Sequence, residues 1–173
     1  MSVKAPAAYS SARLIIVMGP TGCGKSTIGR QLAEIYSAVY IEGDDHHSAE
    51  NKQKMHAGTA LTDEDRWPWL REIAITMKSQ HGRTIASCSS LKRAYREFMA
   101  RAAGEPILYI YLHGSVETLS ERLSGRQGHF MNSGLLNSQL ATLEAPGEDE
   151  YSVAVSVEQP AADIVEQISR SLG

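Results

Sequence analysis

Hydrophobic residues fall into short runs that alternate with amphipathic stretches along the chain. Residues 14–18 form a continuous apolar run, which is typical of a strand buried on both faces of a parallel sheet. The stretch 26–36 then carries apolar residues at the spacing of one helix face, at Ile28, Leu32, Ala33 and Ile35. The chain therefore opens with a strand followed by a helix.

The same alternation continues to the carboxyl terminus. Further strands are predicted at residues 39–41, 84–88, 107–112 and 152–157. Helices are predicted at about 68–79, 91–102, 116–123 and 161–172, with another ending near 143 and a polar helical region reaching about 58. Pro68 would then occupy a first helical turn, where its missing N–H has no intrahelical partner. Five alternating strands predict an α/β fold with a parallel sheet covered by helices on both faces, and ligands at the strands' carboxyl ends.

The chain has no internal repeat, low-complexity linker or composition break that would mark a second domain. Its 173 residues suffice to bury one core. We therefore expect a single domain over residues 13–173 after a flexible leader, 1–12. The Gly-containing stretch 125–134 is predicted to be a mobile lid.

Composition and charge exclude some classes of binding partner. The net charge is −3 and lysines and arginines are spread along the chain, which argues against nucleic acid as the main partner. No apolar stretch is long enough to span a bilayer, and residues 1–11 lack a secretory core, so we expect a cytoplasmic protein without a membrane partner. Cys23 and Cys88 lack the spacing of a zinc or disulfide framework and are expected to be reduced thiols.

Residues 19–26, GPTGCGKS, fit the P-loop pattern between the first strand and the first helix. Backbone N–H groups of such a loop cradle phosphates, while Lys25 reaches the β- and γ-phosphates and the Ser26 hydroxyl ligates Mg²⁺. The segment predicts that the chain binds a nucleoside triphosphate. The nucleotide-binding residues predicted here are Gly19, Thr21, Gly22, Cys23, Gly24, Lys25, Ser26 and Thr27.

Acidic and histidine residues follow the second predicted strand, in the segment EGDDHH at 42–47. A carboxylate at this position beside the P-loop strand could take a proton from an attacking hydroxyl. The alternative is that the acidic pair belongs to an ordinary solvated loop without a catalytic role, as isolated acidic pairs usually do. The two adjacent histidines lack the spacing of a metal site, which makes a metal bound by them improbable.

The segment LTDEDRWPWL at 61–70 begins with a Thr-x-x-Asp helix-capping pattern, which accounts for Asp63 and Glu64. Arg66 needs another reason, because a cation near a helix N-terminus opposes the helix dipole. An anionic ligand would supply that reason. Trp67 and Trp69 are expected to pack.

Two further pairs of basic residues are spaced four apart. Lys92 and Arg96 would share one face of a helix after the third strand, where the alternatives are a ligand and a solvated basic face. Arg122 and Arg126 lead into the lid, from which a guanidinium could neutralise charge on a transferring phosphoryl group. His129 either contacts the ligand or packs the lid.

Together these segments closely resemble the gluconate kinases, a branch of the P-loop kinases related to shikimate kinase and the nucleoside monophosphate kinases. The resemblance runs from about residue 14 to the carboxyl terminus. Its motifs are GPTGCGKST, GDDHH, LTDEDRWPWL, CSSLKRAYR, LSERLSGRQGHFM and LLNSQLATLEAP. It implies a P-loop NTPase fold of adenylate-kinase type, with ATP and Mg²⁺ as cofactors, D-gluconate as the acceptor and a homodimeric assembly.

The resemblance also implies roles for individual residues. Asp44 would be the catalytic base, while Lys25 and Arg126 would stabilise the transferring group. The sugar acid would contact His47, Arg66, Lys92, Arg96 and Gln139, with His129 as a further candidate. Arg122 and Arg126 would face the phosphates, and Gln159 and Pro160 would border adenine. Glu42 would meet Mg²⁺ through water.

Two positions depart from the family's usual residues. Ser48 stands where the family commonly has Pro, which we expect to loosen the acceptor loop, and Glu42 stands where Asp is commoner. The resemblance thus implies gluconokinase activity, with in-line transfer from MgATP to a primary hydroxyl and Asp44 accepting the proton. The alternatives are a kinase for another small hydroxy acid such as shikimate, or for a nucleotide, and a nucleotide-dependent switch.

Overall fold

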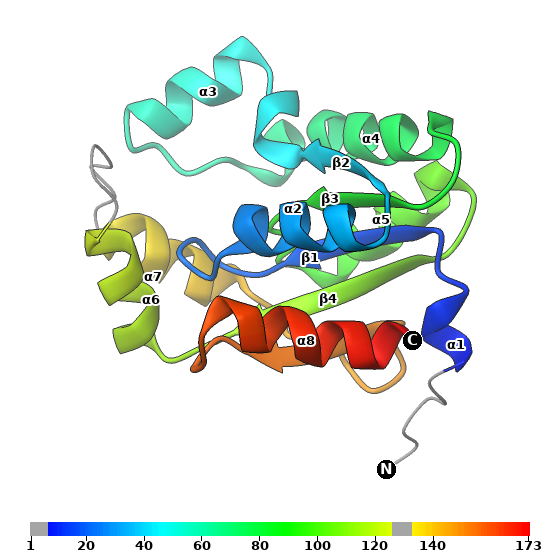
Figure 1. Ribbon diagram of the computed structural model, residues 1–173. Coiled ribbons are helices and arrows are strands. Elements are labelled where there is room, and N and C mark those ends of the chain that lie inside the picture. Colours follow the sequence, from blue (N-terminus) through cyan, green and yellow to red (C-terminus); the bar gives the residue numbers. More distant parts are fainter. Residues whose placement is uncertain (1–6, 126–132) are drawn as a thin grey trace.

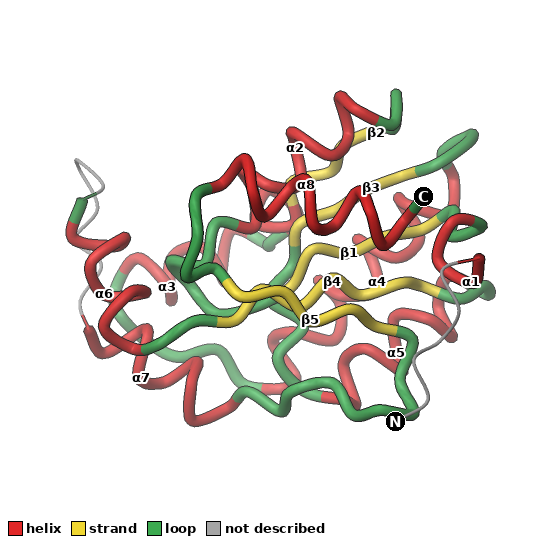
Figure 2. The backbone as a smooth tube through the Cα atoms, turned by 60° about the horizontal axis from the view of Figure 1, so that its bottom comes forward, coloured by secondary structure: helices red, strands yellow, loops and turns green. Residues whose placement is uncertain are grey.

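The computed structural model describes residues 7–125 and 133–173 of the chain. Five strands form one parallel sheet in the order β2-β3-β1-β4-β5, which Figure 2 shows in yellow. The strands are β1 (Leu14–Met18), β2 (Val39–Glu42), β3 (Thr84–Ser87), β4 (Ile107–His113) and β5 (Ser152–Ser156). This arrangement confirms the predicted α/β fold.

Helices cover both faces of the sheet (Figure 1). They are α1 (Ala7–Ser10), α2 (Lys25–Ile35), the 3₁₀ turn η1 (Gly43–His46), α3 (Ala49–His56), α4 (Asp63–Ser79), α5 (Arg93–Ala103), α6 (Val116–Ser124), α7 (Ser133–Thr142) and α8 (Ala161–Leu172). Among the described segments, no helix is both long and apolar enough to cross a membrane.

The central strand β1 joins two hydrophobic clusters. Ile15 and Val17 pack into the cluster that contains the buried residues of α2 and α8. Leu14, Ile16 and Met18 pack into the second cluster, with those of α4 and α5. Alternate residues of a strand point to opposite faces, so a strand between two helical layers must be apolar at every position. This explains the unbroken apolar run.

The carboxyl ends of the parallel strands share one edge of the sheet. The loop between β1 and α2 lies there, and α3, α6 and α7 lie beyond that edge, on the left in Figure 1. Ligand-binding groups of open parallel sheets collect at this edge, so the candidate residues that follow β1, β2 and β3 come within reach of one another.

Helix α4 starts earlier than predicted, at Asp63 and not at Pro68. The Thr62 hydroxyl accepts a hydrogen bond from the Asp65 N–H at 3.2 Å, and the Asp65 carboxylate accepts one from the Thr62 N–H at 2.9 Å. This reciprocal capping box fixes the helix start. Pro68 therefore lies in the second turn, where it removes one intrahelical hydrogen bond.

Helix α5 starts later than predicted, at Arg93. Lys92 is its N-cap and has an extended backbone, with φ −101° and ψ 146°. The expectation that Lys92 and Arg96 share one face of a helix is therefore wrong, because that spacing rule applies only inside a helix. The two side chains bind different partners, as described below.

The predicted flexible leader, residues 1–12, is partly folded in the structure. Within it α1 is helical, the Tyr9 ring stacks on Tyr151 with centroids 5.8 Å apart, and Ala12 is buried. The Tyr9 hydroxyl also donates to the Ser152 carbonyl at 3.3 Å. These contacts attach residues 7–12 to the edge of the sheet at β5.

Candidate functional site

The loop between β1 and α2 presents an uncapped helix N-terminus. Gly24 is the N-cap of α2, and its φ of 92° is a left-handed conformation that favours glycine. Because the N-cap is a glycine, it has no side chain to cap this end, and the N–H groups of the first turn of α2 can bind phosphate oxygens, as the motif predicts. The Lys25 ammonium lies over the loop, where it donates to the Pro20 carbonyl at 3.2 Å.

Two other residues of the loop, Cys23 and Thr21, are held by the protein around them. The Cys23 side chain is fully buried, and burial raises the pKa of its thiol, so Cys23 offers a ligand only its backbone. The Thr21 N–H donates to the Gln139 side-chain oxygen at 2.6 Å. Gln139 of α7 thus binds the P-loop in this structure, on the nucleotide side of the site.

A cavity of about 370 Å³ adjoins the loop. It is lined by Gly22, Gly24, Thr27, Ile28, Arg122, Gly125 and Ala161. The Arg122 guanidinium donates to the carbonyls of Val157, at 2.7 Å, and Gln159, at 3.5 Å. Arg122 therefore joins the phosphate-binding loop to the turn before α8, where Gln159 and Pro160 were expected to border adenine. The volume is within the range of small-molecule sites.

The last residue of β2, Glu42, lies in a hydrogen-bonded network beside Ser26. The Glu42 carboxylate accepts from the Ser87 hydroxyl at 2.7 Å and the Tyr40 hydroxyl at 2.8 Å. Burial would raise its pKa, but hydrogen bonds from Ser26, Ser87 and Tyr40 lower it. Glu42 is therefore an anion with a fixed orientation next to the Ser26 hydroxyl.

Mg²⁺ prefers oxygen ligands and keeps several waters when it binds beside phosphates. A hydroxyl next to an ionised carboxylate fits that requirement. In the described part of the chain no group of three or more His, Cys, Asp or Glu residues could hold a metal by itself.

Asp44 is held at the sheet edge by close packing of the backbone. At Gly43, a Cβ atom would lie only 2.1 Å from the Ser87 carbonyl oxygen, so this approach requires glycine. The indole N–H of Trp69 donates to the Gly43 carbonyl at 2.8 Å. Strand β3 and helix α4 thus fix the turn that carries Asp44.

The Asp44 side chain is accessible to solvent, and the protein around it still desolvates its carboxyl enough to raise the pKa. Lys25 opposes this shift, while Glu42 and Asp45 increase it. A carboxylate with a raised pKa is a better proton acceptor, provided that it stays ionised at neutral pH. Asp44 therefore combines access, proximity to Lys25 and the electrostatics of a general base.

His47 lies between α3 and α4. Its ring stacks on Trp69 with centroids 3.9 Å apart, and burial, together with Lys52 and Arg66, lowers its pKa to about 4. The Asn51 amide nitrogen donates to the Asp65 carbonyl at 2.8 Å and lies 3.4 Å from His47 Nδ1. Since a carbonyl only accepts, that amide nitrogen is a donor to Nδ1 as well, and the ring proton is on Nε2. His47 is a neutral donor.

Arg66 and Lys92 meet around one carboxylate and one phenol. The Lys92 ammonium donates to both Asp63 oxygens, at 3.2 and 3.3 Å. The Arg66 Nη1 donates to the Tyr95 hydroxyl at 2.7 Å, and that hydroxyl donates to Asp63. We call these four residues, Asp63, Arg66, Lys92 and Tyr95, the acceptor cluster. It brings together Arg66 of α4 and Lys92 at the N-cap of α5, the two cations that the sequence predicts for an anionic ligand.

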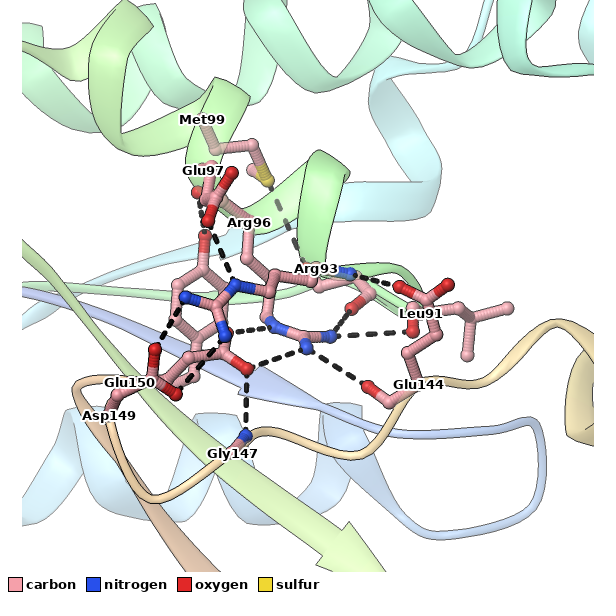
Figure 3. Close-up of polar contacts among 11 residues, drawn as sticks. Leu91, Arg93, Arg96, Glu97, Met99, Glu144, Gly147, Asp149 and Glu150 are labelled. Atoms are coloured by element: carbon pink, nitrogen blue, oxygen red, sulfur yellow. Dashed lines mark hydrogen bonds and ion pairs between the residues drawn. The ribbon is translucent and has the colours of Figure 1, made fainter.

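Arg96 is buried and binds a different set of partners, which Figure 3 shows. Its guanidinium donates to the carbonyls of Ser90, at 2.8 Å, and Glu144, at 2.9 Å. It also forms an ion pair with Glu150, 2.7 Å from Nε to Oε1, in which only 2% of the Arg96 side chain is exposed. The sequence left two alternatives for Arg96, a contact with the substrate or a place on a solvated basic face. The structure shows neither, because all three guanidinium nitrogens bind the protein.

Glu150 completes the Arg96 network. Burial would raise its pKa, but hydrogen bonds from Arg96 and from the Gly147 N–H lower it. The network ties residues 144–150, which follow α7, to the loop that carries Lys92. Arg96 thus holds the loop that carries Lys92 in a fixed position.

Two predicted site residues, Arg126 and His129, lie outside the described residues, as does most of the predicted lid. Sequence reasoning missed several residues that orient the site. Tyr40 carried a usable signal, since it lies two positions before Glu42 and so on the same face of β2. Tyr95 and Glu150 gave no local signal, because their partners are 29 to 54 residues away in the chain.

The predicted packing of the tryptophans is confirmed. Trp69 is 5% exposed, and Trp67 packs against Tyr95 and Phe98 with ring centroids 5.4 and 5.0 Å apart. Trp69 does more than pack, because it positions both Gly43 and His47.

Comparisons with known proteins show which family the chain resembles. Residues 14–146 match the family model of an AAA domain. The chain is 41% identical to a gluconokinase of Gluconobacter oxydans, over 91% of this chain and 90% of that protein. It is 39% identical to a probable gluconokinase of Xenopus tropicalis, with 90% of each chain covered.

A solved structure shows the same architecture. The crystal structure of a gluconokinase from Sinorhizobium meliloti is 45% identical in sequence and superposes with a TM-score of 0.86. The match covers 92% of this chain and 90% of that one. The predicted resemblance is thus confirmed over most of the chain.

The Arg96 network predicts a large stability effect from one substitution. Arg96→Ala removes the cation paired with the Glu150 carboxylate and the donor to the carbonyls of Ser90, Leu91 and Glu144, so we expect the free energy of unfolding to fall by about 3–5 kcal/mol. Urea denaturation followed by circular dichroism measures it. Arg93→Ala is the matched control, because Arg93 lies on the same helix but pairs with Asp149 at the exposed surface. Equal losses in the two variants would contradict the buried network.

The neutral state of His47 predicts a pH effect. Its pKa in the folded protein is about 4, against an ordinary value near 6.5, so the unfolded chain binds the extra proton first as pH falls. Its contribution to stability is full above about 6.5 and disappears progressively between about 6.5 and 4. NMR titration of the ring protons should give a midpoint near 4, and a midpoint above 6 would refute the buried, neutral assignment.

Proposed function

The chain belongs to the gluconokinase family, and we propose that it transfers the γ-phosphoryl group of ATP to the primary hydroxyl of D-gluconate. The products are ADP, 6-phospho-D-gluconate and the proton lost by the hydroxyl. The observation that carries this proposal is the placement of Asp44 beside Lys25 at the same sheet edge as the P-loop, with Arg66 on α4 and Lys92 at the N-cap of α5.

The nucleotide side of the site supports ATP as the donor. The uncapped start of α2 and the Lys25 ammonium would hold the phosphates, and the cavity beside Arg122 would take the nucleoside. Ser26 and Glu42 would hold Mg²⁺, directly and through water. The metal would supply charge neutralisation between the β- and γ-phosphates.

The acceptor side would hold the sugar acid at both ends. Arg66 and Lys92 offer cations for the carboxylate, and His47 offers an Nε2–H for a hydroxyl along the chain. The far hydroxyl would then lie at Asp44, which takes its proton as the oxygen attacks the γ-phosphorus. Lys25 would stabilise the charge that develops on the phosphoryl oxygens.

The proposal also includes several predictions made from the sequence. Arg126 and His129 would act from the predicted lid. Gln139, whose side-chain oxygen holds the Thr21 N–H, would meet the acceptor through its amide nitrogen. A cytoplasmic location and a homodimer also remain predictions.

The acceptor preference tests the function. Assays of ADP release with ATP and Mg²⁺ should rank D-gluconate above D-glucose, shikimate, glycerate and AMP. Glucose offers no anion, so it would leave desolvated cations unpaired, and glycerate is too short to span from the cations to the base. Glucose turned over as fast as gluconate would refute the anion site. A preference for shikimate or AMP would refute the gluconokinase assignment.

Substituting the base separates binding from chemistry. Asp44→Asn should lower turnover by about 10²–10⁴-fold while ATP still binds, because the amide cannot accept the proton. Asp45→Asn is the matched control, one residue away on the same 3₁₀ turn. Steady-state kinetics and calorimetric titration of ATP measure the two effects. If Asp45→Asn alone abolished turnover, the base would be Asp45.

A further inference from the structure

Asp63 is an acidic residue inside a site for an anion. Its carboxylate accepts both hydrogen bonds of Lys92 and one from Tyr95, and it lies 3.8 Å from the Arg66 guanidinium. As the first residue of α4, Asp63 suits the helix dipole, but it makes none of the reciprocal capping bonds, which belong to Thr62 and Asp65. Its carboxylate is instead bound by Lys92 and Tyr95, so its charge also acts within the acceptor cluster.

The charges of the acceptor cluster sum to +1. Arg66 and Lys92 contribute two positive charges and Asp63 one negative charge. The neighbouring carboxylate of Asp65 is already balanced by Lys54, 2.8 Å away, and His47 is neutral. One singly charged carboxylate therefore neutralises the cluster, whereas a doubly charged phosphate would leave an excess negative charge beside Asp63.

We propose that Asp63 determines specificity by setting this net charge, so that the acceptor site selects a monoanionic carboxylate against a dianionic phosphate ester. The inference rests on the proposed function for the placement of the acceptor's acid group. It goes beyond that function because it assigns a role in rejection to a residue of the same sign as the substrate. Discrimination between ligands often comes from such a repulsive element.

The cluster retains capacity to bind a carboxylate. Arg66 uses Nη1 on Tyr95, while its Nε and Nη2 form no hydrogen bond with another described residue. A fork of two N–H groups matches the two oxygens of a carboxylate. Asp63 holds Lys92 and Tyr95 beside that fork, which keeps the second cation close without giving the site a second uncompensated charge.

Two linear polyols with a free primary hydroxyl provide matched probes: D-gluconate carries one negative charge and D-glucitol 6-phosphate two. Their dissociation constants are measured by calorimetry without nucleotide, so the result does not depend on turnover. In Asp63→Asn the amide oxygen still accepts from Tyr95, but the repulsion is gone. We expect the ratio of phosphate affinity to gluconate affinity to rise about tenfold over the wild type, the effect of one unit charge a few ångströms away in a partly solvated site.

Two further variants complete the test. Glu64→Gln removes the same charge from the same helical turn, but Glu64 is exposed, and we expect the ratio to change less than about twofold because solvent and salt screen it. Lys92→Met lowers the net charge to zero, and the ratio should fall. Both results, with the tenfold rise in Asp63→Asn, support the proposal.

The opposite results are equally clear. An unchanged ratio in Asp63→Asn, or an equal rise in Glu64→Gln, would overturn the role of Asp63. Because the ratio is a binding measurement, it fails independently of the proposed function. A wild-type protein that binds gluconate but does not phosphorylate it would refute the kinase assignment and leave the charge selection standing.

Discussion

The structure depends on one constraint, the burial of β1 between two strands and two layers of helices. All five residues of β1 have no exposed surface, and the strand pairs with β3 on one side and β4 on the other. A strand fixed on four sides cannot shift register without moving every side chain to the wrong face. The loop that follows β1 is therefore held rigidly, and so is the uncapped start of α2.

The pairing register fixes the positions of the neighbouring strands relative to β1. Val17 pairs with Ser87, and Ser87 pairs with Glu42 at the end of β2. The hydrogen bond from Ser87 to Glu42 is thus a consequence of sheet register, and it orients the carboxylate toward Ser26. The next residue is Gly43, whose close approach to Ser87 sets the turn with Asp44. Asp44, the proposed base, is therefore positioned by the sheet and not by a free loop.

The sequence predicted what depends on local pattern. The P-loop, the five strands and the residues that follow β2 were all found from runs and spacing. The role of Arg96 was not, because a basic residue four positions from Lys92 looks the same whether it faces solvent or a buried partner. Its partner Glu150 lies in an irregular segment 54 residues away, and no periodicity links the two. The predicted start of α4 at Pro68 is wrong, because proline can also lie in the second turn of a helix, and the capping box of Thr62 and Asp65 sets the start at Asp63.

The two departures from the family's usual residues are each compensated by a neighbour. Ser48 has a φ of −62°, which a proline would also adopt, but its hydroxyl accepts a hydrogen bond from the Asn51 N–H at 3.1 Å and caps α3. The expected loosening of the acceptor loop is therefore offset by a cap that proline could not provide. At the other position, the longer Glu42 side chain reaches the Tyr40 and Ser87 hydroxyls, which take up its extra length and fix its orientation. At both positions, side-chain hydrogen bonds fix the local structure directly beside a predicted site residue, at Ser48 next to His47 and at Glu42 next to Ser26.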